Sequence, residues 1–290
     1  MKAKRSRIVI VLSLLWTCGS LVNAAYAAGE EANLADGAVL RIFGSAGHRK
    51  DPAALYRLGN MFDEGSGVPQ DHEEAFRWYY RASELGSADA MNCMGIAYAT
   101  GQGTPQSYAL SLRWFFKAAK YGSVEAMSNL AKVYLQGLGM SASYSEAARW
   151  FELAVRAGDA SAMNNLALMY EKGIGVTRDH AVALTLLAQS AKRGHAPAML
   201  NLGTLYANGE SKRDTLLAFA WLEAALEAGL QGEEKRIASY RLGAVAARLD
   251  PTDLMRARRL VGEISTAVTP PHPPSRRAHS GRFAVKPAMS

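Results

Sequence analysis

The sequence has almost no cysteine. Its 290 residues include only two, Cys18 and Cys93. So few thiols exclude a framework of several disulfides, and the fold must therefore be held together by packing. No histidine accompanies Cys93 in the sequence, so we expect this residue to be a small, partly buried apolar side chain and not a reactive thiol.

The sequence also lacks the short motifs of the common enzyme classes. It contains no HExxH, GxSxG, CxxC, GxxxxGK or SxxK pattern. The six histidines do not cluster, and His72 and His180 occupy one position of a repeat where other copies carry Tyr108 and Tyr144. We predict no catalytic residue, no metal site and no cofactor, and we interpret both histidines as half-buried side chains at the start of a helix.

Strong charge is absent from the body of the chain. The formal net charge is +7, but four basic residues stand in the first seven positions and four more in residues 269–290, which contain no acid. The body between these ends is therefore close to neutral. This balance argues against a nucleic-acid-binding surface.

The one long apolar run is too short to span a bilayer comfortably. The basic stretch MKAKRSR is followed by IVIVLSLLW, and the small residues AYA end at Ala27. This pattern predicts a signal peptide over residues 1–27, cleaved near Ala27, and hence export to the periplasm or secretion. Two alternatives stay open, an uncleaved N-terminal anchor and a lipid attached to Cys18, which follows a loose match to a lipoprotein box.

What the sequence does contain is a repeat. The copies start 36 residues apart, and we number their columns from the first alanine. They read ALYRLGNMFDEGSGV at Ala54, AMNCMGIAYATGQGT at Ala90, AMSNLAKVYLQGLGM at Ala126, AMNNLALMYEKGIGV at Ala162 and AMLNLGTLYANGESK at Ala198. A fixed period of this length indicates stacked supersecondary units.

Each copy predicts two helices. In the first helix, columns 1, 2, 5 and 9 form an apolar stripe about three turns long. Column 12 is always glycine, which predicts a left-handed C-cap, and a second glycine at column 14 continues the turn. Column 18 predicts the N-cap of the second helix. The expected N-cap residues are Asp71, Ser107, Ser143, Asp179 and, after a one-residue deletion, Asp214.

The second helix has a large residue between small ones. Columns 22 and 29 are alanine or serine, and column 25 holds tryptophan in four of the five copies. We interpret the tryptophans as core residues that fill the gap to the next repeat. Column 4 carries Asn129, Asn165 and Asn201, which suggests a row of hydrogen bonds between helices.

Helices this short are marginal alone in water, and each pair has two apolar faces to cover. Only stacking covers both faces. We therefore predict an all-α fold, a right-handed α/α solenoid of helical hairpins with 36-residue repeats. The predicted parts are an N-terminal capping segment at 28–53 with one helix over 30–45, five repeats at 54–232, a C-terminal capping hairpin at 233–268, and a disordered basic, proline-rich tail at 269–290.

The recurring pattern A-x-x-x-L-G-x-x-Y-x-x-G-x-G-V, followed by D-x-x-x-A, W-x-x-x-A and a final glycine, resembles the Sel-1-like repeat, a relative of the tetratricopeptide repeat. It covers about residues 54–229. The departures are small: alanine replaces the column 6 glycine twice, Leu186 replaces one tryptophan, and the fifth copy is one residue short. The resemblance implies an adaptor-like protein that binds other proteins, in bacteria often after export.

Columns 3, 7, 10 and 11 share the face of the first helix opposite the apolar stripe. By analogy with tetratricopeptide arrays, this face lines a concave groove. Amides there could hydrogen-bond an extended peptide, and leucine and isoleucine could anchor it; the alternative is an ordinary solvated face. The candidate partner-binding residues are Tyr56, Asn60, Asp63, Asn92, Ile96, Ser128, Lys132, Gln136, Asn164, Leu168, Glu171, Lys172, Thr204 and Asn208.

The predicted function is a non-catalytic protein–protein interaction module, an adaptor or regulator exported to the cell envelope. We expect a protein or extended peptide in the groove and no nucleic acid, and a weak contact of the basic tail with anionic envelope surfaces. Two alternatives stay open: an envelope or cell-wall-binding protein with hydrolase activity, and a structural scaffold anchored in the membrane.

Overall fold

The computed structural model describes residues 51–268, which form twelve α-helices and no strand. The predicted signal peptide, the predicted helix over 30–45 and the predicted tail lie outside these residues. The helices are α4 (Pro52–Glu64), α5 (His72–Glu84), α6 (Ala88–Thr100), α7 (Tyr108–Lys120), α8 (Val124–Gln136), α9 (Tyr144–Arg156), α10 (Ala160–Lys172), α11 (His180–Lys192), α12 (Ala196–Ala207), α13 (Lys212–Glu227), α14 (Gly232–Ala246) and α15 (Pro251–Ala267).

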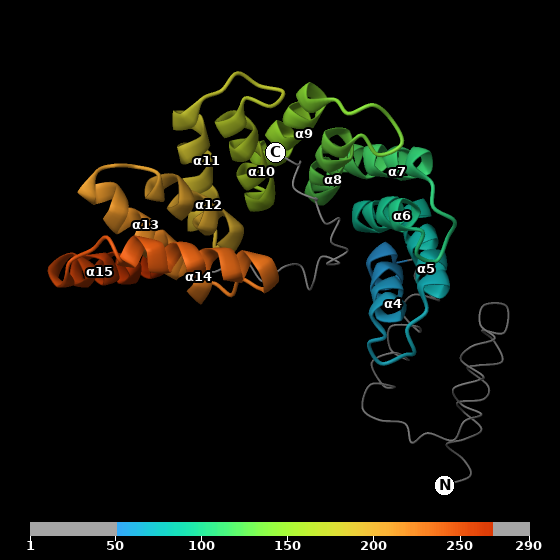
Figure 1. Ribbon diagram of the computed structural model, residues 1–290. Helices are drawn as coiled ribbons and strands as arrows, with labels where there is room; N and C mark the ends of the chain where they lie inside the picture. The colour runs from blue at the N-terminus through green and yellow to red at the C-terminus, as the bar shows by residue number, and fades with distance from the viewer. Residues whose placement is uncertain (1–50, 269–290) are drawn as a thin grey trace, which may run out of the picture.

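The first ten helices form five hairpins, each packed on the next. We call α4, α6, α8, α10 and α12 the A helices and their partners α5, α7, α9, α11 and α13 the B helices. The A helices begin 36 residues apart, each B helix packs on its own A helix, and the first four B helices also pack on the A helix of the next hairpin. Figure 1 shows the result as an arch, with the A helices on its inner side and the B helices on its outer side. The predicted all-α solenoid of 36-residue hairpins is confirmed.

The second glycine of the inter-helix loop has a role that the repeat alone does not reveal. A Cβ atom at Gly103 would lie 2.0 Å from the carbonyl oxygen of His72, and one at Gly175 would lie 2.4 Å from that of Tyr144. The loops of the second, third and fourth hairpins therefore pass directly over the first turn of the preceding B helix. Glycine is needed because the two backbones touch, and also because φ is positive at both positions.

The predicted helix caps are mostly present, with two corrections. Asp71 accepts hydrogen bonds from the backbone N–H groups of Glu73 and Glu74, but the Ser143 side chain makes no capping hydrogen bond. In the fifth repeat the N-cap is Ser211, whose Oγ accepts from the backbone N–H of Asp214, the third helical residue, and donates to the Asp214 carboxylate. The prediction of Asp214 as the N-cap was wrong because the shorter loop lets α13 begin one turn earlier.

The core of each hairpin depends on column 26, which the sequence reasoning overlooked. This column is almost fully buried: Tyr79 3%, Phe115 0%, Phe151 0%, Leu187 1% and Leu222 0% exposed. The glycine of column 6 makes room for it, since a Cβ at Gly95 would lie 2.5 Å from the ring of Phe115. Each such side chain stabilises its hairpin by about 1.5 to 3 kcal/mol relative to exposure.

The column 25 side chains fill the gap between repeats, as predicted. Trp114 contacts the core clusters of the first and second hairpins, and Trp150 those of the second and third. The edge of Trp114 meets the ring of Tyr80 from the preceding B helix at 6.4 Å between centroids. These rings are part of the core, so they do not form an aromatic binding box.

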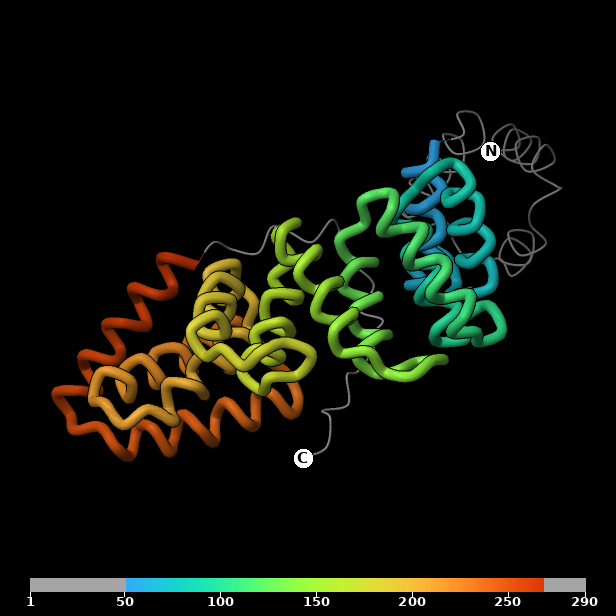
Figure 2. The backbone as a smooth tube through the Cα atoms, turned by 90° about the horizontal axis from the view of Figure 1, so that it is seen from above, coloured from blue at the N-terminus to red at the C-terminus, as the bar shows by residue number. Residues whose placement is uncertain are grey.

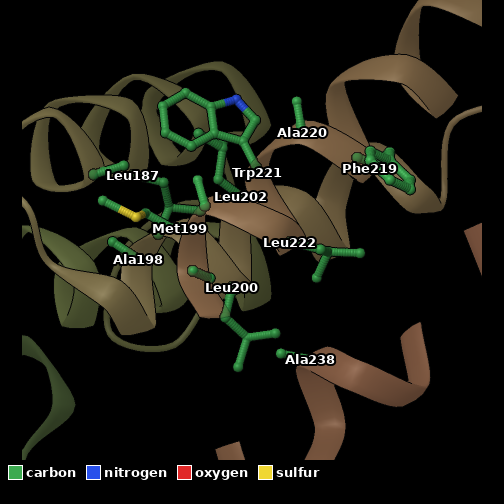
Figure 3. Close-up of a cluster of buried hydrophobic side chains, with 14 of the residues drawn as sticks. Leu187, Ala198, Met199, Leu200, Leu202, Phe219, Ala220, Trp221, Leu222 and Ala238 are labelled. Atoms are coloured by element: carbon green, nitrogen blue, oxygen red, sulfur yellow. The ribbon is translucent and has the colours of Figure 1, made fainter. Parts of the chain in front are cut away.

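The C-terminal end departs from the repeat. Both α14 and α15 pack mainly on α13, and α14 also contacts α12. Figure 2 shows the two helices diverging from their connection in a V. The predicted capping hairpin is wrong in this respect, because each helix buries only a few side chains, and these face α12 and α13. In Figure 3, Ala238 of α14 lies next to Leu200 of α12, within a cluster that continues through Leu222.

Within residues 51–268, no helix has both the length and the apolar character that a membrane crossing requires.

Candidate interaction surface

The structure places the predicted groove residues along the A helices, on the inner side of the arch, but it does not leave all of them open. Ile96 is 8% exposed, Ser128 4% and Asn164 7%. We had expected these side chains to face solvent in the groove. They are instead part of the packed fold, since Ile96 belongs to the core cluster of the second hairpin, and Ser128 and Asn164 form hydrogen bonds with Asp159 and Asn201.

A row of side-chain hydrogen bonds joins the A helices on this inner side. Asn129 Nδ2 donates to Asn92 Oδ1 at 3.0 Å, and Asn201 Nδ2 donates to Asn164 Oδ1 at 2.8 Å. The column 4 hydrogen bonds expected from the sequence are therefore confirmed for Asn129 and Asn201. Their acceptors are two of the candidate binding residues, whose amide oxygens thus hold repeats together and are not free for a peptide.

The N-terminal candidates are also bonded within the fold. The Tyr79 hydroxyl donates to Asn60 Oδ1 at 2.9 Å. The rings of Tyr56 and Tyr79 lie 6.0 Å apart, and burial raises the pKa of both phenols. Cys93 is buried next to them, and burial raises the pKa of its thiol. Cys93 therefore packs as an apolar side chain, as predicted, but it is buried and not partly buried.

Two acidic candidates pair with histidines of their own repeat. His72 Nδ1 lies 2.7 Å from Asp63 Oδ1, and His180 Nδ1 lies 2.7 Å from Glu171 Oε2. In the second and third repeats, where column 10 is apolar, column 19 is tyrosine. His72 is half-buried as predicted, whereas His180 is exposed. Across residues 51–268, histidine, cysteine and acidic side chains form no group that could hold a metal.

A cluster of titratable groups lies near the centre of the array, and only Lys132 of it was predicted. Asp159 caps α10, accepting from Ser161 N at 2.7 Å, and also accepts from the Ser128 hydroxyl. Burial lowers the pKa of Lys132, which the Asp159 carboxylate partly offsets. Burial likewise lowers the pKa of His195, the N-cap of α12; Asp159 opposes this shift and Lys132 adds to it.

The sequence did carry a signal for this cluster. Column 34 is the N-cap of the next A helix, and it holds serine in two copies but Asp159 and His195 in the next two. A titratable pair at a column otherwise occupied by serine marks a local departure from the repeat. Candidate binding residues were taken only from columns of the first helix, so the pair was missed.

The candidates that remain accessible lie in the C-terminal half of the arch. Their side chains are partly or fully exposed and, unlike Lys132, which interacts with the Asp159 carboxylate, they have no hydrogen-bonding or charged partner among the other described residues. They are Gln136, Leu168, Lys172, Thr204 and Asn208, which we call the inner surface. It combines an amide pair, a hydroxyl, an ammonium group and an apolar side chain, a mixture that can bind both the backbone and the side chains of a peptide.

The inner surface leads into a cleft of about 580 Å³ between the end of α12 and α14, which we call the α12–α14 cleft. Asn208 lines it from α12, and Arg236, Tyr240 and Arg241 line it from α14. Tyr240 is 81% exposed, the most exposed of the large apolar side chains in the described residues. None of the α14 residues was predicted, because the helix was interpreted only as a cap.

The cleft has a fixed geometry at its base. Arg248, near the end of α14, donates to the carbonyl oxygens of Ala207 at 3.0 Å and Gly209 at 3.3 Å, and to Thr215 Oγ1 at 3.2 Å. These bonds satisfy carbonyl groups at the C-terminal end of α12, where the helix leaves them without partners. They hold α14 at a defined position against the fifth repeat.

Comparison with known proteins agrees with this architecture. The family model described as Sel1 repeat matches residues 52–87, 88–123, 124–159, 160–195 and 196–230. A crystal structure of a Sel1 repeat protein from Oxalobacter formigenes is similar, with 28% identity and a TM-score of 0.58, over 66% of this chain and 79% of the other. No curated protein matches the sequence.

A second solved structure is that of c5321, a protective antigen present in uropathogenic Escherichia coli strains that displays an SLR fold. It is 26% identical with a TM-score of 0.53, over 78% of this chain and 55% of the antigen. Proteins built from Sel1 repeats are generally non-catalytic scaffolds that bind other proteins. With five consecutive repeats matched across residues 52–230, the chain belongs to the Sel1 repeat family.

Proposed function

We propose that this protein is a non-catalytic interaction module that binds a segment of a partner protein along the inner surface of its third to fifth repeats. The observation that carries the proposal is the division of the inner side into two halves. Candidate side chains of the first two repeats are largely committed to hydrogen bonds within the fold, whereas the five of the inner surface are accessible and have no bonded partner among residues 51–268.

The chemistry of the inner surface favours an extended peptide. Gln136 and Asn208 each offer an amide donor and acceptor, which can bond a peptide backbone whatever its side chains are. Leu168 offers an apolar contact, and Lys172 offers a charge at the rim. The near-neutral body of the chain is unsuited to a polyanion such as nucleic acid.

The proposal includes export. The basic start, the apolar run and the small residues before Ala28 support a cleaved signal peptide. The basic tail over 269–290 would add a weak attraction to anionic envelope surfaces. Mass mapping of the N-terminus of the protein recovered from cells tests export, since a start near Ala28 is expected and retention of Met1 would contradict cleavage.

Site-specific photocrosslinking in intact cells tests the binding surface. A photoreactive amino acid is placed at Lys172 or Thr204 on the inner surface and, as a matched control, at Arg113 or Lys192, which are exposed on the B helices. We expect a protein adduct from the inner positions and none from the outer ones. Equal adducts from both sides, or none from the inner side, would contradict partner binding along the inner surface.

A further inference from the structure

The α12–α14 cleft carries an excess of positive charge that the fold does not use. Its lining includes three arginines and one glutamate. Arg236 pairs with that glutamate, Glu233, and Arg248 is bonded to the end of α12. Arg241, a half-buried residue, forms no side-chain hydrogen bond or ion pair with any of the described residues. An unpaired guanidinium inside a cleft is a binding group without its anion.

The apolar part of the cleft lies beside this charge. Ile237 lies four residues before Arg241, and Tyr240 lies one residue before it. All three are therefore on the side of α14 that lines the cleft. The phenol ring of Tyr240 is 81% exposed, although tyrosine and arginine are the residues that most often dominate binding at protein interfaces. The ligand that fits is therefore an anion with an apolar or aromatic neighbour.

The position of the cleft identifies the occupant as part of a longer chain. Ala207 and Asn208 line it from columns 10 and 11 of the fifth repeat, so it continues the inner surface without a break. A peptide that follows the inner surface reaches Arg241 after Asn208.

We propose that the α12–α14 cleft binds an acidic segment of the partner protein, in which one carboxylate forms a two-bond pair with the Arg241 guanidinium and an adjacent apolar side chain covers Ile237 and Tyr240. The planar guanidinium offers two parallel N–H donors to a carboxylate, which a lysine could not do. The inference rests on the proposed function, because it names the chemistry of the partner segment that the inner surface holds.

An array of immobilised 12-residue peptides tests the proposal with the chain from residue 28 onward. The peptides vary acidic, basic and apolar content independently over many sequences, and each acidic peptide has counterparts with glutamine or lysine in place of glutamate. We expect binding to acidic peptides with a neighbouring leucine or aromatic residue, about tenfold or more weaker binding to the glutamine counterparts, and loss of binding at high ionic strength.

Variants of exposed residues then identify the site. Arg241→Glu should weaken binding of the acidic peptides at least tenfold and improve binding of the lysine counterparts, and Tyr240→Ala should weaken the former several-fold. Arg259→Glu, on an 85% exposed side chain of α15 outside the cleft, should change nothing. Circular dichroism confirms that each variant is folded.

Three results would overturn the inference: no peptide binds, glutamine counterparts bind as well as acidic peptides, or Arg241→Glu binds the acidic peptides unchanged. The proposed function is judged separately. If inner-surface crosslinks still capture a protein while the acidic peptides fail, the inference alone is wrong. If acidic peptides bind through Arg241 while the inner surface yields no crosslink, the proposed binding along the inner surface is wrong and the binding in the α12–α14 cleft stands.

Discussion

The first four repeats and the fifth repeat, at the C-terminal end, each consist of an A helix and a B helix. The loop that joins the two helices differs in length between them. In the first four, a seven-residue loop separates the A and B helices, and each B helix has 13 residues. In the fifth, the loop has four residues and α13 has 16. Gly209, which replaces the left-handed C-cap glycine, has no positive φ.

This difference has a functional consequence. Uniform loops stack uniform hairpins and cover each face with the next repeat. A shortened loop starts α13 one turn earlier, and the following helices then diverge on either side of it instead of forming a sixth hairpin. The α12–α14 cleft, with its arginines, exists because the repeat becomes irregular after α12. Regular repeats thus provide the arch, and the irregular end provides the cleft that we propose as a distinct binding site.

The largest effect is expected when a buried aromatic ring is removed from one of the regular repeats. Phe151→Ala leaves a cavity in the third hairpin at a fully buried position, and we expect a loss of about 3 to 5 kcal/mol in the free energy of unfolding. Because stability is shared with both neighbouring hairpins, hydrogen exchange should accelerate on both sides of the cavity.

Leu222→Ala, at the same column of the fifth repeat, is the matched variant. It should cost about 2 to 5 kcal/mol in urea denaturation, but exchange should accelerate mainly over α12 to α15, because no regular repeat follows. Equal spreading of exchange toward the first repeat in both variants would show that the end is not a separate unit.

The second test uses two loop glycines to separate the effect of a backbone contact from the effect of a positive φ. Gly103 and Gly122 both have positive φ, but only Gly103 lies against another backbone, 2.0 Å from the His72 carbonyl oxygen for an added Cβ. Gly103→Ala should lower the free energy of unfolding by about 2 to 4 kcal/mol, since strain and overlap add, whereas Gly122→Ala should cost only about 1 to 2 kcal/mol. Similar losses in thermal denaturation would disprove the backbone contact.

The same loop shows how far sequence reasoning extends. Columns that recur in every copy were interpreted correctly as helices and inter-repeat rings, and most caps were also correct, because periodicity reports what all copies share. Contacts between copies were not visible, since the period does not reveal that Gly103 touches His72. Column 26 is large in every copy, so its role in the core could have been found from the repeat but was overlooked. The sequence also could not predict which of the candidate residues are accessible. Asn164 and Lys172 are both polar, but packing buries Asn164 and leaves Lys172 exposed.

A smaller effect is expected from the hydrogen bonds between A helices. Asn201→Ala removes the donor to Asn164 Oδ1, and since Asn164 is 7% exposed, its oxygen is left buried without a partner, at a cost of about 1 to 3 kcal/mol. Asn129→Ala removes the corresponding donor to Asn92, which is partly exposed, and water can replace it. Urea denaturation of the two variants checks the order, and a larger loss for Asn129→Ala would contradict it.

The smallest expected effect is the pH dependence contributed by His195, where the fifth repeat meets the regular part. Burial holds the pKa of the folded-state imidazole below its unfolded value, with the opposing attraction of Asp159 too weak to reverse the shift. Below an unfolded pKa of about 6.5, the unfolded chain therefore binds a proton that the folded chain resists. This contribution to stability is complete above that pH and is lost as the pH falls toward the folded pKa. Urea denaturation of His195→Asn, which keeps an N-cap residue, should show a flatter decline between neutral and mildly acidic pH than the parent protein. A parallel decline would show that His195 titrates alike in both states, and that the junction between the regular repeats and the irregular end is open to water.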